Sequence, residues 1–292
     1  MQIESLKVYC DLIETESFTK TAQINGVTQS AVSQTMSVLE RQFQALLVER
    51  SKKSFRITPE GEIVYRESKR ILHEYSTLHT RIEAMKNVVS GNIRIATVYS
   101  IGLHEMPPYI KRFMKEYPEV NIHLEYRRPN QVYEDVLGNV ADLGLLAFPG
   151  RNPKLEIVPL RKEPLMLVCS PQNPLAKSKS IKLKALSGQK FISFERDMPA
   201  RKAIDKIFKA HGVVAQHVME FDNIETLKRA VEIDSGIALL PQTSVKQEVS
   251  NHTLSTVPLE GSFFWHLGLI HKKARALSPA LKLLIAQLEK PL

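Results

Sequence analysis

Apolar residues in the first 58 positions recur at steps of three and four, which is the spacing of helices that bury one face. The pattern predicts a first helix along residues 6–18, a short second helix over residues 19–25 and a third helix that begins at Thr28. A short basic stretch, residues 50–57, follows the third helix. The N-terminal part of the chain is therefore predicted to be a small helical domain.

Residues 58–89 continue as one long amphipathic pattern. Thr58 fits an N-cap, and Pro59 stands at the favoured first position of a helix. Apolar residues then follow at alternating steps of four and three, as in a heptad seam that is interrupted at Ser68. The seam consists of Val64, Ile71, Tyr75, Leu78, Ile82, Met85 and Val89. A narrow seam on a long helix suits a second helix, so we predict that residues 59–90 form a linker helix that dimerises. The alternative is a helix that lies along its own domain.

Beyond residue 90, strand-like runs alternate with helical runs. The strand-like runs are residues 93–98, 120–126, 143–148, 165–169, 191–194, 218–221, 237–240 and 265–271. The helical runs are residues 107–116, 200–211 and 224–233. This alternation is typical of an α/β domain with a mostly parallel sheet. The segment is long for one doubly wound sheet, so we expect lobe I over about 91–161 and 270–292 and lobe II over about 162–269.

The composition is that of an ordinary globular protein with an excess of positive charge. The chain has 292 residues, of which 43% are hydrophobic and 24% are charged, and its net charge is +9. This charge favours an anionic partner such as nucleic acid, a membrane surface or an acidic ligand. Residues 1–60 hold seven basic and seven acidic side chains, however, so most of the surplus lies in the C-terminal part.

Several classes of protein are disfavoured by what the sequence lacks. Two cysteines are too few for a disulfide framework, so a reducing cytoplasm is the expected compartment. The first residues include acids where a signal peptide has a basic start, and no apolar run reaches the length of a membrane span. We therefore expect no membrane partner. The histidines form no metal-ligand spacing, so we expect no metal and no cofactor.

The stretch from Phe18 to Gln34 has the pattern of a helix-turn-helix. Ala22 supplies the small residue where two short helices cross, Gly26 suits the tight turn, and Thr28 fits an N-cap. The helix after the turn carries small or amide side chains, which can hydrogen-bond base edges and phosphates in a major groove. The predicted DNA contacts are Thr28, Gln29, Ser30, Ser33, Gln34 and Ser37. The alternative is an ordinary polar helix surface.

Four cations follow this motif within seven residues and are offset only by Glu49. A loop or short β-wing that bears them is expected to hold phosphates beside the groove, with an affinity that falls as salt rises. These cations are Arg50, Lys52, Lys53 and Arg56.

Residues 3–61 resemble the DNA-binding domain of the LysR-type transcriptional regulators. The matching elements are Ser17-Phe18, Ala22, Thr28-Gln29-Ser30-Ala31-Val32-Ser33, Leu39-Glu40, Glu49-Arg50 and Ile57-Thr58-Pro59-Glu60-Gly61. Gln44 and Val48 depart from the glycine and phenylalanine that are usual in the family. The resemblance implies a periplasmic-binding-protein-like domain with two lobes around a ligand cleft. It also implies a tetramer built from linker-helix dimers.

The expected fold class is thus α + α/β. A winged helix-turn-helix over residues 1–58 is followed by the linker helix over 59–90 and by a two-lobed α/β effector domain over 91–292.

Ligands of open α/β sheets bind beyond the carboxyl ends of the strands, where helix N-termini favour anions. The residues at such places, and at the places to which the resemblance points, are Tyr99, Ser100, Ile101, Phe148, Arg196, Arg201, Asn223 and Ile224. Ser100 and Arg201 are the expected direct contacts, with Arg196 supporting the charge. The alternatives are that Ser100 is a helix cap and that Arg201 forms a surface ion pair. The expected effector is an anionic metabolite or an inorganic anion.

The sequence therefore predicts a DNA-binding transcriptional regulator whose promoter binding or DNA bending is controlled by a small-molecule effector. Its expected partners are double-stranded promoter DNA, further copies of itself in a homodimer or homotetramer, the effector and RNA polymerase. An enzyme is disfavoured, because the sequence has no glycine-rich nucleotide loop and no nucleophile elbow. A solute-binding transport component is disfavoured by the N-terminal domain.

Overall fold

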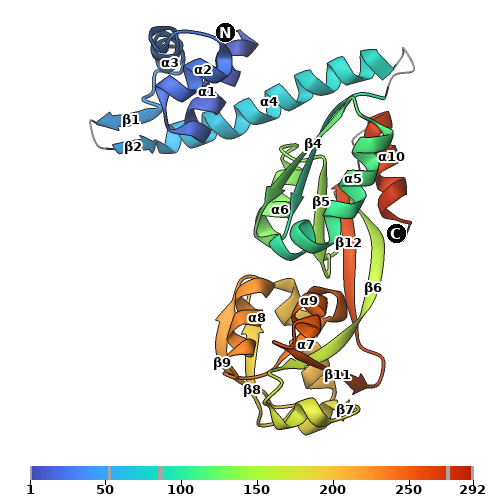
Figure 1. Ribbon diagram of the computed structural model, residues 1–292. Coiled ribbons are helices and arrows are strands. Elements are labelled where there is room, and N and C mark those ends of the chain that lie inside the picture. Colours follow the sequence, from blue (N-terminus) through green and yellow to red (C-terminus); the bar gives the residue numbers. More distant parts are fainter. Residues whose placement is uncertain (1, 52–53, 85–88, 274–276, 291–292) are drawn as a thin grey trace. The chain divides into compact units, whose positions relative to one another are not determined.

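The computed structural model of the protein describes residues 2–51, 54–84, 89–273 and 277–290 (Figure 1). The chain divides into two compact units. The first comprises residues 1–91 together with 138–140, and the second comprises residues 92–137 and 141–292.

The first unit consists of helices and one small antiparallel sheet. Its elements are α1 (Ile3–Thr15), α2 (Phe18–Asn25), α3 (Gln29–Phe43), β1 (Val48–Ser51), β2 (Ser54–Ile57) and α4 (Pro59–Ala84). The helices bury the apolar faces that the spacing predicts, and Tyr9, Leu12 and Leu39 are fully buried in one core. Val48 and Phe55 from the two strands join this core, so the β1–β2 hairpin is attached to the helices.

The helix-turn-helix depends on three local backbone features. Gly26 ends α2 with a φ of 62°, in the left-handed region that glycine adopts without steric cost. Thr28 caps α3, because its side-chain oxygen accepts a hydrogen bond from the amide of Ala31 at 3.2 Å. Gln44 ends α3 with a φ of 51°, so this position takes the left-handed conformation although it is not glycine.

The start of α4 is joined to the rest of the unit by a small set of buried hydrogen bonds. The Thr58 hydroxyl donates to the carbonyl of Leu46 at 2.6 Å and accepts from the amide of Gly61 at 2.9 Å. The buried Tyr9 hydroxyl donates to the carbonyl of Gly61 at 2.8 Å, and burial raises the pKa of Tyr9. A Cβ on Gly61 would lie 2.1 Å from the carbonyl oxygen of Leu47, so this close approach requires glycine.

The second unit has two groups of elements, which we name lobe I and lobe II. Lobe I contains β3 (Gly91–Thr97), the π-helical turn η1 (Ile101–Glu105), α5 (Met106–Glu116), β4 (Val120–Tyr126), α6 (Pro129–Leu137), β5 (Leu143–Ala147) and α10 (Pro279–Leu288). Lobe II contains β7 (Ile181–Lys182), β8 (Lys190–Phe194), α7 (Pro199–Ala210), β9 (Gln216–Phe221), α8 (Ile224–Glu232), β10 (Ala238–Pro241), α9 (Lys246–Ser250) and β11 (Ser255–Glu260). Strand β6 (Leu155–Cys169) runs through both lobes, and β12 (Phe264–Lys272) pairs with its first part (Figure 1).

The main sheet of this unit is mixed, so the expectation of a mostly parallel sheet was wrong. Its strand order is β4-β3-β5-β12-β6-β11-β7, with β10 also paired to β6. Strands β3 and β5 are parallel, but β12 is antiparallel to both β5 and β6, and β6 is antiparallel to β10 and β11. The reason is that β6 and β12 pair in antiparallel orientation: the chain leaves lobe I along β6 and returns along β12 after forming lobe II.

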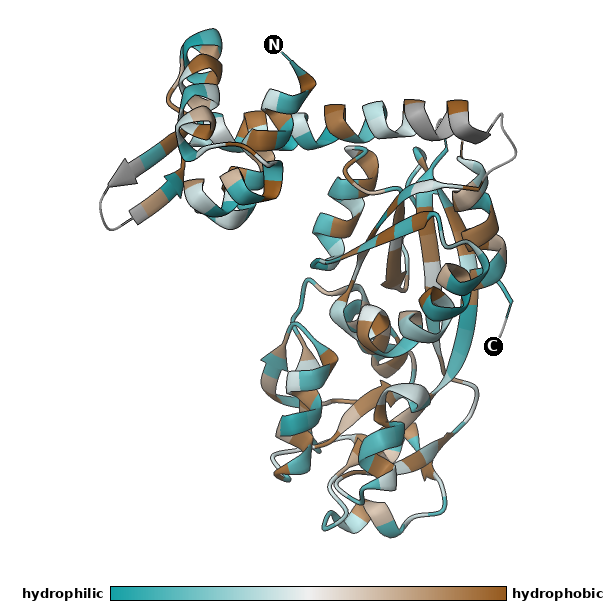
Figure 2. Cartoon of the chain, turned by 45° about the horizontal axis from the view of Figure 1, so that its top comes forward, coloured by the Kyte–Doolittle hydropathy of each residue, from teal (hydrophilic) through white to brown (hydrophobic). Residues whose placement is uncertain are grey.

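The core of lobe I follows the hydrophobic runs of the sequence, whereas the first part of β6 does not. Figure 2 shows hydrophobic residues concentrated on the strands of the sheet, and Ile95, Leu145 and Leu269 are fully buried there. The strand β6 begins ten residues before the predicted run 165–169. That earlier part contains Pro159 and a run of charged residues, and much of it is exposed, so it lacks the pattern of a buried strand.

We predict that Gly61→Ala destabilises the first unit by about 1–3 kcal/mol, because the added Cβ overlaps a backbone oxygen that cannot move freely. Urea unfolding followed by circular dichroism measures the effect. Arg66→Ala, at an exposed position of the same helix, is the control and should leave the midpoint unchanged. Equal midpoints for both variants would show that the close approach is not a constraint.

Candidate functional site

The exposed face of α3 is polar and uncharged, as the sequence indicates. Thr28, Gln29, Ser30, Gln34 and Ser37 are exposed, and Ser33 is half-buried. The hydroxyls of this face are partly engaged, since Thr28 caps the helix and Ser37 donates to the carbonyl of Ser33 at 3.1 Å. The side chains of Gln29 and Gln34 have no hydrogen-bond partner among the described residues. Both amides are therefore available to a ligand that presents paired donors and acceptors.

The basic stretch after α3 forms a two-stranded β-hairpin. In its register Glu49 lies opposite Arg56, and Arg50 lies opposite Phe55. Arg56 is exposed, so its guanidinium can reach an anion. The structure describes the backbone of Arg50 but not its side chain, and Lys52 and Lys53 lie outside the described residues.

The predicted seam of α4 divides into two parts. Val64 packs against the core of the first unit, so the start of the helix belongs to its own domain. Farther along, four seam residues expose between 44 and 53% of their surface in the described protomer. These residues are Ile71, Tyr75, Leu78 and Ile82. Met85 lies outside the described residues.

A cleft of about 40 Å³ lies between the lobes of the second unit. It is lined by Val98, Tyr99, Ser100, Pro129 and Ala147 from lobe I, by Phe194, Met198, Pro199, Ala200, Asp222, Asn223 and Ile224 from lobe II, and by Trp265 of β12. The first turns of α7 and α8 both reach this cleft, at Pro199 and Ile224. Asn223 caps α8 by accepting from the amide of Thr226 at 3.0 Å. Two helix N-termini thus meet at one cleft, and each favours negative charge.

Four of the eight predicted effector residues line the cleft together: Tyr99, Ser100, Asn223 and Ile224. Ser100 stands at the start of η1, but its side chain makes no capping hydrogen bond. Phe148 lies behind the cleft wall, with its ring centroid 5.0 Å from that of Trp265. Ile101 lines an adjoining cavity of about 20 Å³.

The two predicted arginines are not in the cleft lining. The Arg201 side chain is only 6% exposed and donates to the Phe194 carbonyl, Asp205 and Glu220, each at 2.9 Å. Burial opposes the charge of Arg201, but the hydrogen bonds that it donates to these two carboxylates outweigh burial and raise its pKa. Arg201 is therefore a buried cation held by two partly exposed carboxylates, away from the cleft lining. The Arg196 side chain is 85% exposed, with its Nε 3.7 Å from Glu220.

Arg128, which follows the predicted strand 120–126 but is not among the eight predicted effector residues, supplies a cation at the rim of the cleft. It stands just before α6 in lobe I, and its guanidinium lies 2.8 Å from Glu195 and 3.3 Å from Asp222, both of lobe II. The hydrogen bond with Asp222 and the charge of Glu195 raise the pKa of Arg128. The sequence shows an arginine after a predicted strand, but only the folded chain places two carboxylates beside it.

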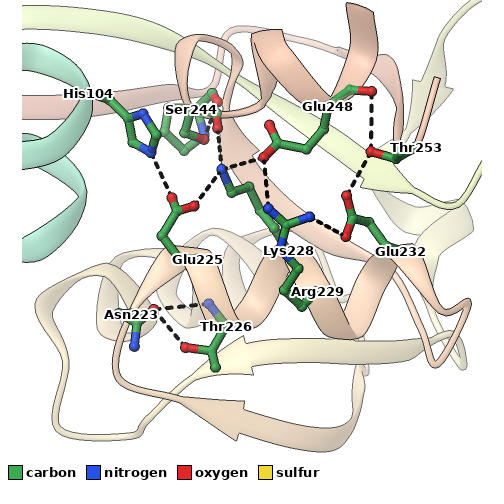
Figure 3. Close-up of polar contacts among 11 residues, drawn as sticks. His104, Asn223, Glu225, Thr226, Lys228, Arg229, Glu232, Ser244, Glu248 and Thr253 are labelled. Carbon is green, nitrogen blue, oxygen red and sulfur yellow. Dashed lines mark hydrogen bonds and ion pairs between the residues drawn. The ribbon is translucent and has the colours of Figure 1, made fainter. Parts of the chain in front are cut away.

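A second contact between the lobes belongs to a buried network, shown in Figure 3. The Nε2 atom of His104, in lobe I, lies 2.7 Å from Oε1 of Glu225, in lobe II. The Lys228 ammonium is 1% exposed and lies 3.0 Å from Glu225, 2.8 Å from Glu248 and 3.0 Å from the carbonyl oxygen of Ser244. Burial opposes ionisation of Glu225, but hydrogen bonds from His104 and Lys228 outweigh it and lower its pKa. The network places the Lys228 ammonium between two carboxylates of lobe II, and one of them, Glu225, also contacts His104 of lobe I.

Among the described residues, no group of three or more His, Cys, Asp or Glu side chains is arranged to hold a metal ion. No helix in the described part of the chain is both long and apolar enough to cross a membrane.

Comparison with known families matches nearly the whole chain. Residues 3–62 match the model of the bacterial regulatory helix-turn-helix protein, lysR family, and residues 86–291 match the LysR substrate binding domain. The chain is 28% identical over 255 residues to the HTH-type transcriptional regulator CysL of Bacillus subtilis, covering 87% of this chain and 85% of CysL. It is 29% identical over 277 residues to the HTH-type transcriptional activator CmpR of Synechocystis, covering 94% of this chain and 91% of CmpR.

Solved structures of low sequence identity share the fold. Full-length CbnR complexed with its target DNA superposes with a TM-score of 0.75 at 18% identity, covering 99% of both chains. The effector binding domain of QuiR in complex with shikimate gives a TM-score of 0.63 at 22% identity and covers 68% of this chain and 95% of that one. The regulatory domain of Synechocystis CcmR in complex with 2-PG gives 0.62 at 22% identity, with the same coverage. The chain therefore belongs to the LysR family of bacterial transcriptional regulators, which combine a DNA-binding helix-turn-helix with an effector-binding domain and are not enzymes.

Proposed function

We propose that this LysR-family regulator reads promoter DNA with the exposed face of α3, and that a small anionic effector in the cleft of the second unit controls this binding. The winged helix-turn-helix is assigned to residues 1–58, the linker helix to 59–90 and the effector domain to 91–292. The observation that carries the DNA-binding part is the pair of unpartnered amides of Gln29 and Gln34 on the exposed face of α3. Glutamine pairs bidentately with adenine, and the neighbouring serines accept or donate to bases and phosphates.

The β1–β2 hairpin supports this role from the side of the helix-turn-helix. Its cations, the exposed Arg56 among them, suit phosphates, which fix the position of a protein on DNA without reading its sequence. The first unit carries no net surplus of charge over residues 1–60, so specificity is assigned to α3 and salt-dependent affinity to the hairpin.

Self-association is assigned to the second half of α4. The stripe of Ile71, Tyr75, Leu78 and Ile82 keeps heptad spacing and is exposed in the protomer, so pairing with the same stripe of a second copy would remove it from water. A dimer would present two copies of α3 to DNA, and a tetramer is assembled from two such dimers. We also assign RNA polymerase as a partner and the cytoplasm as the compartment.

An anionic effector is supported by two features of the cleft and by one neighbouring structure. The first turns of α7 and α8 meet there, and the polar side chains of Tyr99, Ser100 and Asn223 accompany them. Arg128 stands at the rim and pairs with both Glu195 and Asp222. A ligand anion can therefore replace one of these two carboxylates while the other stays paired with Arg128. The neighbouring structure of QuiR holds shikimate, a carboxylate.

Control of DNA binding follows from the position of the cleft between two lobes. A ligand shifts an equilibrium between lobe arrangements only as far as its affinities for the two arrangements differ. The pairs Arg128–Asp222 and His104–Glu225 join the lobes beside the cleft, so a ligand that competes for Arg128 changes the balance between them.

The α3 assignment predicts that Gln29→Ala, Ser33→Ala and Gln34→Ala in one variant abolish sequence-specific binding to promoter fragments, because the base-reading groups are removed. Fluorescence anisotropy with a specific and a scrambled duplex measures the loss. The control is Gln42→Ala, at an exposed position of the same helix outside the polar face. If the triple variant keeps the promoter affinity of the wild type, α3 does not read bases.

The hairpin assignment predicts a different result for Arg56→Gln. Loss of one phosphate contact should weaken binding to specific and scrambled duplexes alike and reduce the slope of log affinity against log salt by about 1. Titrations at several salt concentrations give the slope. A loss confined to the specific duplex would mean that Arg56 reads bases instead.

The effector assignment predicts that organic acids or inorganic anions raise the thermal midpoint of the full-length protein. Asn223→Ala and Ser100→Ala should reduce this stabilisation, because both side chains line the cleft, whereas Ser262→Ala, at an exposed position outside the cleft lining, should not. A response to cationic metabolites together with silence across the anions would overturn the anionic class.

A further inference from the structure

A groove of about 460 Å³ lies on the second unit and shares no lining residue with the cleft. It is formed by paired residues of β6 and β12 together with the residues that follow β5. Its apolar lining comprises Phe148, Pro149, Ile157, Pro159, Leu160 and Leu267. Its volume falls in the range of sites for small organic molecules, whereas the cleft holds about 40 Å³ in this arrangement.

The rim of the groove carries two basic side chains that face each other. Lys162 of β6 is the direct cross-strand partner of His266 of β12, both are exposed, and both line the groove. Neither has an ion-pair partner in the described part of the chain, and the groove lining contains no carboxylate. Two basic groups placed opposite each other repel when both are protonated, and a shared anion removes that repulsion.

The third basic residue of the lining, Arg161, is already neutralised. Its guanidinium pairs with Glu105 and lies 5.5 Å from the ring centre of Tyr109. The basic side chains of the groove lining without an acidic partner among the described residues are therefore Lys162 and His266.

The apolar side of the groove has an unusual backbone. Phe148 has a φ of 51°, in the left-handed region that bulky side chains rarely adopt. The β6–β12 ladder changes register between Leu267 and Gly268, which leaves Leu160 as an extra residue on β6. These two irregularities break the regular strand surface at the place where the apolar side chains line the groove.

One ring separates the groove from the cleft. Phe148 lines the groove and packs edge-on against Trp265, which is buried and lines the cleft. A ligand in the groove that contacts Phe148 therefore contacts a ring that packs against the cleft-lining Trp265.

We propose that this groove is a second ligand site, distinct from the effector cleft, that takes an amphipathic anion. The ligand has an apolar or aromatic body, which lies against Phe148, Pro149 and Leu160, and a carboxylate or similar group, which lies between Lys162 and His266.

The test uses 4-phenylbutyrate as the probe, because its ring suits the groove and exceeds the cleft in size. Trp265 is the single tryptophan of the chain, so its fluorescence in the full-length protein reports binding next to Phe148. We expect 4-phenylbutyrate to change this fluorescence and 4-phenylbutan-1-ol, which lacks the charge, to bind about tenfold more weakly. The double variant Lys162→Gln, His266→Gln should bring the acid to the affinity of the alcohol and leave the alcohol unchanged.

Matched variants separate the groove from other sites. Lys202→Gln removes an exposed lysine of α7 outside the groove lining and should leave the binding of 4-phenylbutyrate unchanged, as should Asn223→Ala in the cleft. Equal affinities of acid and alcohol in the wild type, or no fluorescence change with the acid, would overturn the proposal. So would a loss of binding in Asn223→Ala that the double variant lacks, since the probe would then occupy the cleft. The proposed control by an anionic effector is independent of these outcomes.

Discussion

The pairing of β6 with β12 is the constraint on which the second unit depends. β6 has 15 residues, and it pairs with β12 in lobe I and with β10 and β11 in lobe II. Because a single strand contributes to the sheets of both lobes, each lobe is completed by residues far away in the sequence. The same pair supplies Trp265 to the wall of the cleft and Lys162 and His266 to the rim of the groove. The two surfaces are therefore held at a short distance from one another by one hydrogen-bonded ladder.

The charged contacts of lobe II are of two kinds: those that Glu195 and Asp222 make with Arg128 of lobe I, and those of the buried Lys228 within lobe II. Arg128 and its two carboxylates are all more than one-third exposed, so salt screens them and their contribution to stability is small. Lys228 and Glu248 are buried, and a charge in such a place requires its partners because water cannot replace them. The exposed pairs are suited to exchange with a ligand, and the buried network preserves the structure of lobe II while that exchange occurs.

In the first unit, the contacts that fix the helix-turn-helix are mostly local. Caps at Ser17 and Thr28 and the left-handed turn at Gly26 set the angle between α2 and α3 within a few residues of chain. The junction of Tyr9, Thr58 and Gly61 is long-range, since it joins the first helix to the start of α4 across 52 residues, and the ion pair Glu14–Lys69 joins the same two helices. This junction connects the DNA-reading part to the helix that we assign to dimerisation.

The sequence by itself determined the elements that depend on neighbouring residues. Its periodicity predicted the helices of the first unit and the long helix, and its turn and cap residues predicted the helix-turn-helix, because these features need no knowledge of distant contacts. It also predicted Ser100 and Asn223 as cleft residues, since a residue that follows a strand or opens a helix lies where ligands bind.

Only the tertiary structure decided which arginines have acidic partners. Arg201 looked available in the sequence and is engaged by two carboxylates, while Arg128 gained two acidic partners from the other lobe. The sequence also did not indicate the mixed sheet, because the first part of β6 is half-exposed and contains proline. This part is a strand because it pairs with β12. Local patterns record burial and backbone preference, whereas charge compensation and strand order arise from contacts between segments that the linear sequence keeps apart.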